Sequence, residues 1–230
     1  MIRLATVGTG WIVGEFLKGV REAGGICYTA CYSRDQQRGE AFAEEWGAQK
    51  VYTDLAQMAA DEEIDAVYIA SPNRLHYEQS KLFLQHGKHV ICEKPITVEP
   101  EELQELQELA QQKNLIYIEA LIGVYLPQMK VLQGAVERLG PVHLARFDFS
   151  QYSSKYPAYL RGELPNIFNP QMATGGWMDL GIYCLYPAIM LFGVPDHVHA
   201  HARFLSTGAD GSGCVTLQYP DKTVVLTYSK

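Results

Sequence analysis

A lysine stands where a buried strand is expected to end, and this position suggests catalytic chemistry. The triplet Glu93-Lys94-Pro95 directly follows the apolar run 89–92, which has the pattern of a short strand. In an open α/β sheet, ligands bind in the crevice at the carboxyl ends of the strands. An ammonium group there can polarise a carbonyl or hydroxyl group and stabilise developing charge. The simpler alternative is an ordinary surface lysine.

A glycine-rich turn near the N-terminus supplies a second signal. Gly8-Thr9-Gly10-Trp11-Ile12 joins an expected strand at 2–7 to an expected helix at 11–22. The first glycine permits a tight turn, and the second lets the backbone approach a pyrophosphate at the helix N-terminus. The motif is imperfect, because Val13 takes the third small position and Gly14 follows it. Its context nevertheless predicts dinucleotide binding.

The end of the second expected strand, at 26–32, bears on which dinucleotide is bound. An NAD-preferring site usually places a carboxylate there to bind the ribose hydroxyls. This chain has Ser33 and Arg34, with Arg38 about one helical turn further on. A hydroxyl and guanidinium groups suit a 2′-phosphate, so we expect NADP as the cofactor, with NAD possible. A serine helix cap followed by solvent-facing arginines would explain the same residues.

An acid and a phenol share one face of an otherwise apolar expected helix at 177–192. Asp179 and Tyr183 are four residues apart and follow the pair Gly175-Gly176. A tyrosine near a lysine can donate a proton to a carbonyl as a hydride arrives, because the cation favours the phenolate. Equally, the tyrosine could pack in the core and the aspartate could cap a backbone group.

Histidines add one weak candidate. The loop Ser71-Pro72-Asn73 with His76 follows the fourth expected strand and could contact the nicotinamide ribose, although a histidine near a helix start is more often structural. His197, His199 and His201 alternate along one strand face, where we expect solvent contact and no metal site.

Composition limits the class of protein. The chain has 230 residues, 47% of them apolar, and a formal charge of -7. This is enough for one large or two modest domains, and the lack of a basic run argues against a nucleic-acid partner. No run approaches the roughly 18 apolar residues of a membrane span, and no secretory signal precedes the first strand. Five scattered cysteines predict reduced thiols in a cytoplasmic protein.

The alternation of strands and helices in the first half predicts an α/β fold with a doubly wound parallel sheet. Further strands are expected at 50–52, 66–70, 88–92 and 115–119, and further helices at 35–46, 54–60, 74–86 and 101–113. We expect a dinucleotide-binding Rossmann domain at 1–122 and a substrate and oligomerisation domain at 123–230.

The second half has a different pattern. An alternating segment at 143–152 predicts an antiparallel strand, and a loop follows to Gly176. After the helix, which Pro187 should kink, strands are expected at 197–205, 213–219 and 222–228, the last two joined by a turn at 219–222. The last strand should be an open edge that could pair with another chain, and an apolar sheet would favour a homo-oligomer.

Together these residues resemble the glucose–fructose oxidoreductase / inositol dehydrogenase / MocA (Gfo/Idh/MocA) family over essentially the whole chain. The family consists of NAD(P)-dependent oxidoreductases, mostly of sugars and polyols. The resemblance implies a Rossmann domain followed by an α+β domain whose open, mostly antiparallel sheet makes oligomer contacts. It also implies that this chain is C-terminally truncated relative to the family.

Tyr183 indicates which branch of the family this chain resembles. Many members have a histidine where this chain has Tyr183, and a tyrosine there is similar to the dihydrodiol dehydrogenase / D-xylose dehydrogenase branch. The resemblance implies that Lys94 and Tyr183 are the catalytic pair, with Tyr183 as the acid and Asp179 assisting or orienting the substrate. That branch usually has a tryptophan and an arginine where this chain has Ile122 and Val124, which affects the substrate contacts.

The predicted function is hydride transfer between the nicotinamide of NAD(P) and a CH–OH or carbonyl group of a sugar, a diol or a small carbonyl compound. The resemblance adds Glu93, Lys94 and Pro95 to the cofactor contacts. The alternative is a non-catalytic NAD(P)-binding protein with a redox-sensing or regulatory role. A weaker one is a nucleotide-sugar enzyme that keeps its cofactor bound.

Overall fold

The computed structural model describes residues 1–230 as two compact units, Met1–Ala120 and Leu121–Lys230. The boundary lies two residues before the position expected from the sequence. Each unit has its own sheet and its own core. No helix is long and apolar enough to cross a membrane.

The first unit is built on a six-stranded parallel sheet with the strand order β3-β2-β1-β4-β5-β6. The strands are β1 (Ile2–Val7), β2 (Ile26–Tyr32), β3 (Lys50–Tyr52), β4 (Ala66–Ile69), β5 (His89–Cys92) and β6 (Tyr117–Glu119). The helices are α1 (Trp11–Ala23), α2 (Gln36–Trp46), α3 (Leu55–Ala60), α4 (His76–Gln85) and α5 (Pro100–Gln112). The strand order reverses between β1 and β4, which is where a doubly wound sheet binds its ligand. The predicted parallel sheet is confirmed.

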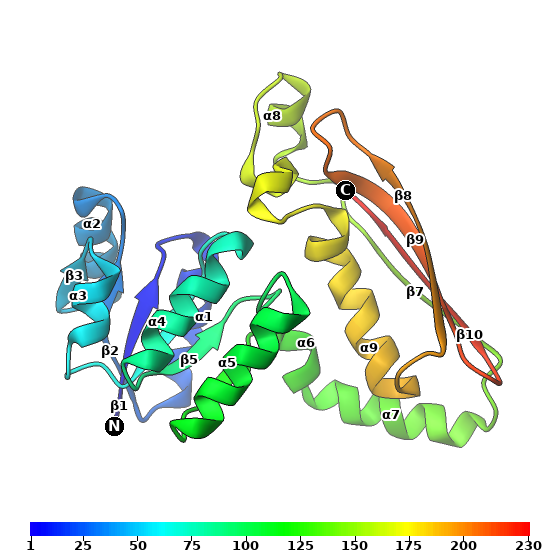
Figure 1. Ribbon diagram of the computed structural model, residues 1–230, viewed down its shortest axis with the longest axis horizontal. Coiled ribbons are helices and arrows are strands. Elements are labelled where there is room, and N and C mark those ends of the chain that lie inside the picture. Colours follow the sequence, from blue (N-terminus) through cyan, green and yellow to red (C-terminus); the bar gives the residue numbers. More distant parts are fainter. The chain divides into compact units, whose positions relative to one another are not determined.

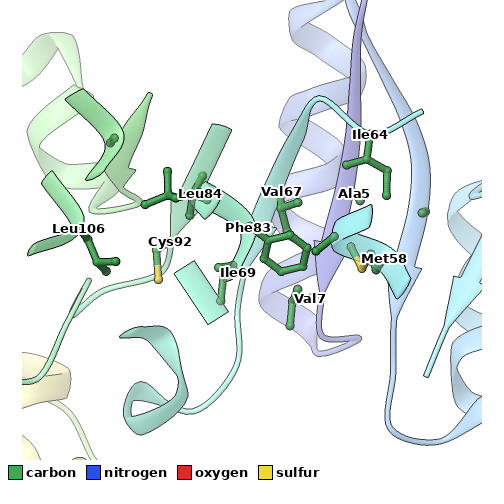
Figure 2. Packing of buried hydrophobic residues seen from close by; sticks show 14 of the residues in the cluster. Ala5, Val7, Met58, Ile64, Val67, Ile69, Phe83, Leu84, Cys92 and Leu106 are labelled. Carbon is green, nitrogen blue, oxygen red and sulfur yellow. The ribbon is translucent and has the colours of Figure 1, made fainter. Parts of the chain in front are cut away.

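Two hydrophobic clusters cover the two faces of this sheet. Successive residues of β1 point to opposite sides, so Leu4 packs in one cluster while Ala5 and Val7 pack in the other. Figure 2 shows the second of these, in which Val67 and Ile69 of β4 surround the ring of Phe83 from α4. A parallel sheet buried on both faces requires continuously apolar strands. This is why its strands were readable from the sequence.

The second unit contains a four-stranded mixed sheet with the order β7-β10-β9-β8. The strands are β7 (Leu144–Ser150), β8 (His197–Phe204), β9 (Asp210–Gln218) and β10 (Thr223–Ser229). Strand β9 is antiparallel to both of its neighbours, whereas β7 is parallel to β10. The sheet is therefore mostly antiparallel, as predicted.

Two expectations about this sheet are wrong. The alternating segment that became β7 was expected to pair antiparallel, but it runs parallel to β10, from Leu144 beside Thr223 to Ser150 beside Ser229. The last strand was expected at an open edge, but β10 lies between β7 and β9. A parallel pair needs a long crossover connection, and the chain supplies it by passing through a helix and placing β8 at the far edge.

The helices of the second unit include two that the sequence patterns did not predict, α7 (Pro127–Leu139) and α8 (Tyr156–Leu160); α6 (Ile122–Tyr125) is one short turn. The expected helix at 177–192 begins with a π-helical turn, Trp177–Gly181, and continues as α9 (Ile182–Phe192), which contains Pro187. Figure 1 shows α9 lying along one face of the sheet. Cys184 and Ala188 of α9 pack there against alternate residues of β9 and β10.

The opposite face of this sheet is polar, which corrects the expected apolar sheet. Strand β8 is exposed along its whole length, and its residues His197, His199 and His201 share the face turned away from α9. Thr216 and Cys214 of β9 lie beside His199 and His201 in the ladder. Because the period of a strand is two, Val215 and Leu217 of β9 lie on the other face and pack against α9.

Candidate functional site

The glycine turn follows β1 and is shaped by a close backbone contact. Gly8 has a φ of +112°, and a Cβ atom there would lie 2.9 Å from the carbonyl oxygen of Ala70. Gly10 precedes α1, and a Cβ atom there would meet nothing within 4 Å. Helix α1 has no side-chain cap and no acidic residue in its first turn. The turn thus leaves open space and a positive helix end where an anion would bind.

This arrangement fits the pyrophosphate of a dinucleotide. The N–H groups at the start of a helix need an acceptor, and no side chain of α1's cap provides one. The imperfect third position of the motif has a structural explanation. Val13 is buried in the core, and Gly14 lets α1 approach α2, since a Cβ atom on Gly14 would lie 2.9 Å from the ring of Trp46. Gly14 therefore serves helix packing.

The segment after β2 places the guanidinium group of Arg38 against the glycine turn. Ser33 is buried, and its Oγ accepts a hydrogen bond from the N–H of Asp35 at 3.2 Å. The carboxylate of Asp35 caps α2 by accepting from the N–H of Arg38 at 2.9 Å. The Arg38 side chain donates to the carbonyl of Thr9 at 3.4 Å, and Arg34 is exposed. Asp35, the carboxylate nearest the end of β2, is therefore engaged in capping α2, whereas Arg34 and Arg38 are exposed.

His76 ties two predicted site loops together. Its side chain is fully buried, with Nδ1 2.8 Å from the carbonyl oxygen of Pro95 and Nε2 2.9 Å from that of Ser71. Burial lowers the pKa of His76, and the two carbonyls raise it by less. The neutral ring donates to one of these oxygens. His76 therefore holds the loops at the ends of β4 and β5 from within.

The lysine loop is fixed by further hydrogen bonds. Glu93 accepts from the phenol of buried Tyr68 at 2.5 Å and from the N–H of Lys94 at 3.2 Å. The N–H of Ile96 donates to the Glu119 carboxylate at 2.8 Å. The Lys94–Pro95 peptide bond is cis, and Lys94 is half-buried. Glu93 is thus engaged within the protein, and Lys94 stands on a rigid loop.

The π-helical turn before α9 packs closely on the sheet at the pair Gly175-Gly176. A Cβ atom on Gly175 would lie 1.9 Å from Oδ1 of Asp210, and one on Gly176 would lie 2.7 Å from the ring of Tyr228. The other carboxylate oxygen of Asp210 accepts from the N–H of Trp177 at 2.7 Å. The glycines therefore let the π-helical turn sit directly on β9 and β10.

Tyr183 lies one turn beyond Asp179 and is half-buried. Its ring meets the edge of Phe149 from β7, with ring centroids 5.5 Å apart. An apolar cavity of about 70 Å³ adjoins Tyr183, walled by α6, α7 and α9. Val124, one of the two departures from the branch pattern, lines this cavity, whereas Ile122 is 67% exposed. The phenol is therefore held by apolar neighbours of its own unit.

Asp179 has a partner that sequence reasoning missed. The amine of Lys230, at the end of β10, contacts the Asp179 carboxylate, and the Lys230 side chain is only 4% exposed. The only hint in the sequence was strand alternation, which puts Lys230 on the same face as the buried residues Leu226 and Tyr228.

The structure gathers most of the predicted residues into two groups. In the first unit, the glycine turn, the β2 end, the 71–76 loop and the 93–95 loop all follow parallel strands at one edge of the sheet. In the second unit, Asp179 and Tyr183 lie on consecutive turns of one helical segment. Joint action of Lys94 and Tyr183, which belong to different units, stays a prediction.

Comparisons with known proteins match the two units of the chain separately. A family model described as "Oxidoreductase family, NAD-binding Rossmann fold" matches residues 2–121, and the "GFO/IDH/MocA C-terminal domain" matches residues 135–230. The scyllo-inositol 2-dehydrogenase (NADP(+)) IolU of Bacillus subtilis is 42% identical over 230 residues, which cover all of this chain and 70% of that protein. The trans-1,2-dihydrobenzene-1,2-diol dehydrogenase of Mus musculus is 31% identical over 195 residues, covering 83% of this chain and 56% of that protein.

A solved structure shows the same fold. The myo-inositol 2-dehydrogenase of Lactobacillus plantarum superimposes with a TM-score of 0.86 at 19% identity, covering 99% of this chain and 69% of that one. The predicted fold class, and an oxidoreductase that uses a nicotinamide dinucleotide, are confirmed. Matched along both of its units, this chain belongs to the Gfo/Idh/MocA family of oxidoreductases.

Proposed function

We propose that this protein is an NADP-preferring dehydrogenase of a cyclic polyol, a sugar or a related diol. The observation that carries the proposal is the edge of the first sheet, where an uncapped helix follows β1 and a rigid lysine loop follows β5. The names of two relatives, an inositol dehydrogenase and a dihydrodiol dehydrogenase, support a substrate with adjacent hydroxyl groups.

In this proposal, bound NADP would supply the hydride chemistry, and residues of the chain bind the cofactor and transfer the proton. The turn at Gly8–Ile12 holds the pyrophosphate, with contacts from Ser71-Pro72-Asn73. Lys94 donates to the reacting oxygen of the substrate and stabilises its developing negative charge. Tyr183 exchanges the hydroxyl proton, and Asp179 accepts a hydrogen bond from a substrate hydroxyl.

The preference for NADP rests on the β2 end. Asp35 is committed to the α2 cap, so we propose that Arg34 and Arg38 receive the 2′-phosphate. Arg34→Ala should weaken NADPH binding about tenfold, as expected for a charge-assisted hydrogen bond, and should change NADH binding little. Fluorescence titration of both cofactors measures this. Equal losses for the two cofactors would place Arg34 away from the phosphate.

The catalytic assignment is tested by turnover. The purified chain, with NADP and a panel of inositols, sugars and diols, should produce NADPH absorbance. Tyr183→Phe and Lys94→Ala should each lower kcat by at least about tenfold, within the range of general acid–base contributions. Tyr183→Phe should retain NADPH binding within a few-fold. Near-normal kcat in either variant contradicts the catalytic pair.

The rival function is a non-catalytic NAD(P)-binding regulator. Val124 and exposed Ile122, where the related branch has larger polar or aromatic residues, motivate it. NADPH binding without turnover across the whole panel favours this rival. Cofactor that survives desalting points to the third possibility, an enzyme that keeps its cofactor bound.

We also propose a cytoplasmic homo-oligomer that associates through the second unit's sheet. The polar face and the fully exposed edge strand β8 offer hydrogen-bonding groups to a second copy. Light scattering during size-exclusion chromatography measures the mass. A monomer at micromolar concentration would contradict this assembly.

A further inference from the structure

Lys230 is a buried cation with a carboxylate partner beside Tyr183. Lysine is rarely this buried unless it is paired, because an unpaired ammonium group loses its hydration without compensation. The amine contacts Asp179, whose carboxylate is itself partly shielded, and Lys222, the next lysine back along the chain, is paired with Asp221 instead. Such a pair is costly to break, because removing one partner leaves the other charge without compensation.

The backbone fixes Lys230 in this place. Its N–H donates to the carbonyl oxygen of Gly211 at 2.9 Å, which continues the ladder between β10 and β9. Strand alternation then turns Lys230 to the α9 side, as it does Tyr228. The helix comes close enough because Tyr228 packs on Gly176 and Asp210 binds the N–H of Trp177. The sheet thereby presents a cation to the turn that carries Asp179.

We infer that Lys230 is a positioning residue that orients the Asp179 carboxylate toward a substrate hydroxyl. This inference rests on the proposed function. A carboxylate beside an ammonium group is a weaker base, so the pair favours Asp179 as a hydrogen-bond acceptor and leaves proton exchange to Tyr183. The site therefore favours substrates with a second hydroxyl next to the reacting carbon, because the deoxy analogue cannot donate a hydrogen bond to this carboxylate.

Lys230→Met tests the inference, since it keeps the length of the side chain and removes its charge. KM for the polyol should rise about tenfold or more, the range for losing a hydrogen bond to a charged group, while kcat changes less. The preference over the deoxy substrate should shrink. Lys230→Arg keeps the charge and should recover part of the loss. Lys222→Met, which breaks another lysine–aspartate pair of the same unit, should change KM less than about twofold.

The pH profile separates positioning from simple support of the fold. Lys230→Met removes the positive charge that faces the Asp179 carboxylate, so the acidic limb of kcat/KM should move to higher pH in this variant. A purely structural lysine would lower the melting temperature without moving this limb. An unmoved limb and unchanged KM in Lys230→Met, in a protein where Tyr183→Phe loses turnover, overturn the inference and leave the proposed function standing.

A stability cycle makes the test independent of turnover. Lys230→Met and Asp179→Asn, alone and combined, should be non-additive in urea unfolding, because each single change strands the other charge. Additive effects overturn the inference even if no substrate is found. Strong coupling together with no turnover on any polyol would refute the proposed function instead.

Discussion

The two units hold their candidate site residues in different ways. In the first unit the residues stand on loops after parallel strands, and buried side chains such as His76 and Tyr68 bind those loops from behind. In the second unit they stand on one helical segment, which a glycine pair and a buried ion pair dock onto the sheet. Loop residues depend on hydrogen bonds to the backbone, whereas helix residues depend on how the whole helix packs.

The largest expected effect tests helix docking in the second unit. Gly175→Ala should destabilise that unit by about 3 kcal/mol, because its Cβ atom would lie 1.9 Å from the Asp210 carboxylate. Gly193→Ala is the matched control, since Gly193 also has a positive φ but a Cβ atom there would meet nothing within 4 Å. Urea unfolding measures both. Equal losses would mean that backbone conformation, and not docking, makes Gly175 necessary.

The corresponding change in the first unit is His76→Leu. It removes the ring that donates a hydrogen bond to one of the carbonyl oxygens of Ser71 and Pro95, which should cost about 1–3 kcal/mol of unfolding free energy. NADPH binding should weaken as well, because both loops lose their common anchor. The exposed His86 serves as the control in His86→Leu. Unchanged NADPH affinity in a destabilised His76 variant would show that the loops do not need this anchor.

His76 also predicts a pH dependence with a definite sign. Its pKa in the folded protein is lowered from 6.5 by burial, so the unfolded chain binds the proton more readily. The stabilising contribution of neutral His76 is therefore present above about pH 6.5 and is lost as the pH falls toward the lowered pKa.

Urea midpoints from pH 5 to 8 measure this dependence, with His76→Leu as the reference. The variant should show a flatter profile than the parent over that range. A parent whose stability rises on acidification would mean that the two carbonyls hold the ring protonated, contrary to the direction given by burial.

The smallest expected effect comes from an exposed ion pair. Lys18 and Glu15 on α1 are 2.7 Å apart with 59% and 53% of their side chains exposed. Lys18→Met should therefore change the unfolding free energy by less than about 0.5 kcal/mol. Lys230→Met should cost clearly more, and comparable losses would erase the contrast between surface and buried pairs.

Most of the first unit could be predicted from the sequence because its signals are local. Continuous apolar runs such as 66–69 and 89–92 mark strands buried on both faces, and Gly8 and Gly10 mark the turn into α1. The Rossmann fold and the dinucleotide turn follow from these. The bridge that His76 makes between Ser71 and Pro95 could not be predicted from neighbouring residues, because its two partners belong to separate loops.

The second unit was harder to predict from the sequence, because its strand pairings join segments that are distant in the chain. Strand β7 was found as an alternating run, but its parallel pairing with β10, in which Leu144 lies beside Thr223, follows from the tertiary arrangement alone. The same pairing makes β10 a central strand and so brings Lys230 under the helix that carries Asp179.

The amino-acid sequence alone determined the family and the cofactor class and supplied the candidate catalytic residues, because those depend on residue type and short spacing. The tertiary structure alone decided which carboxylates are engaged, with Asp35 capping a helix and Asp179 facing a buried ammonium group. The physical reason is that a side chain's charge and orientation depend on its neighbours in space, and folding brings those neighbours from remote parts of the chain.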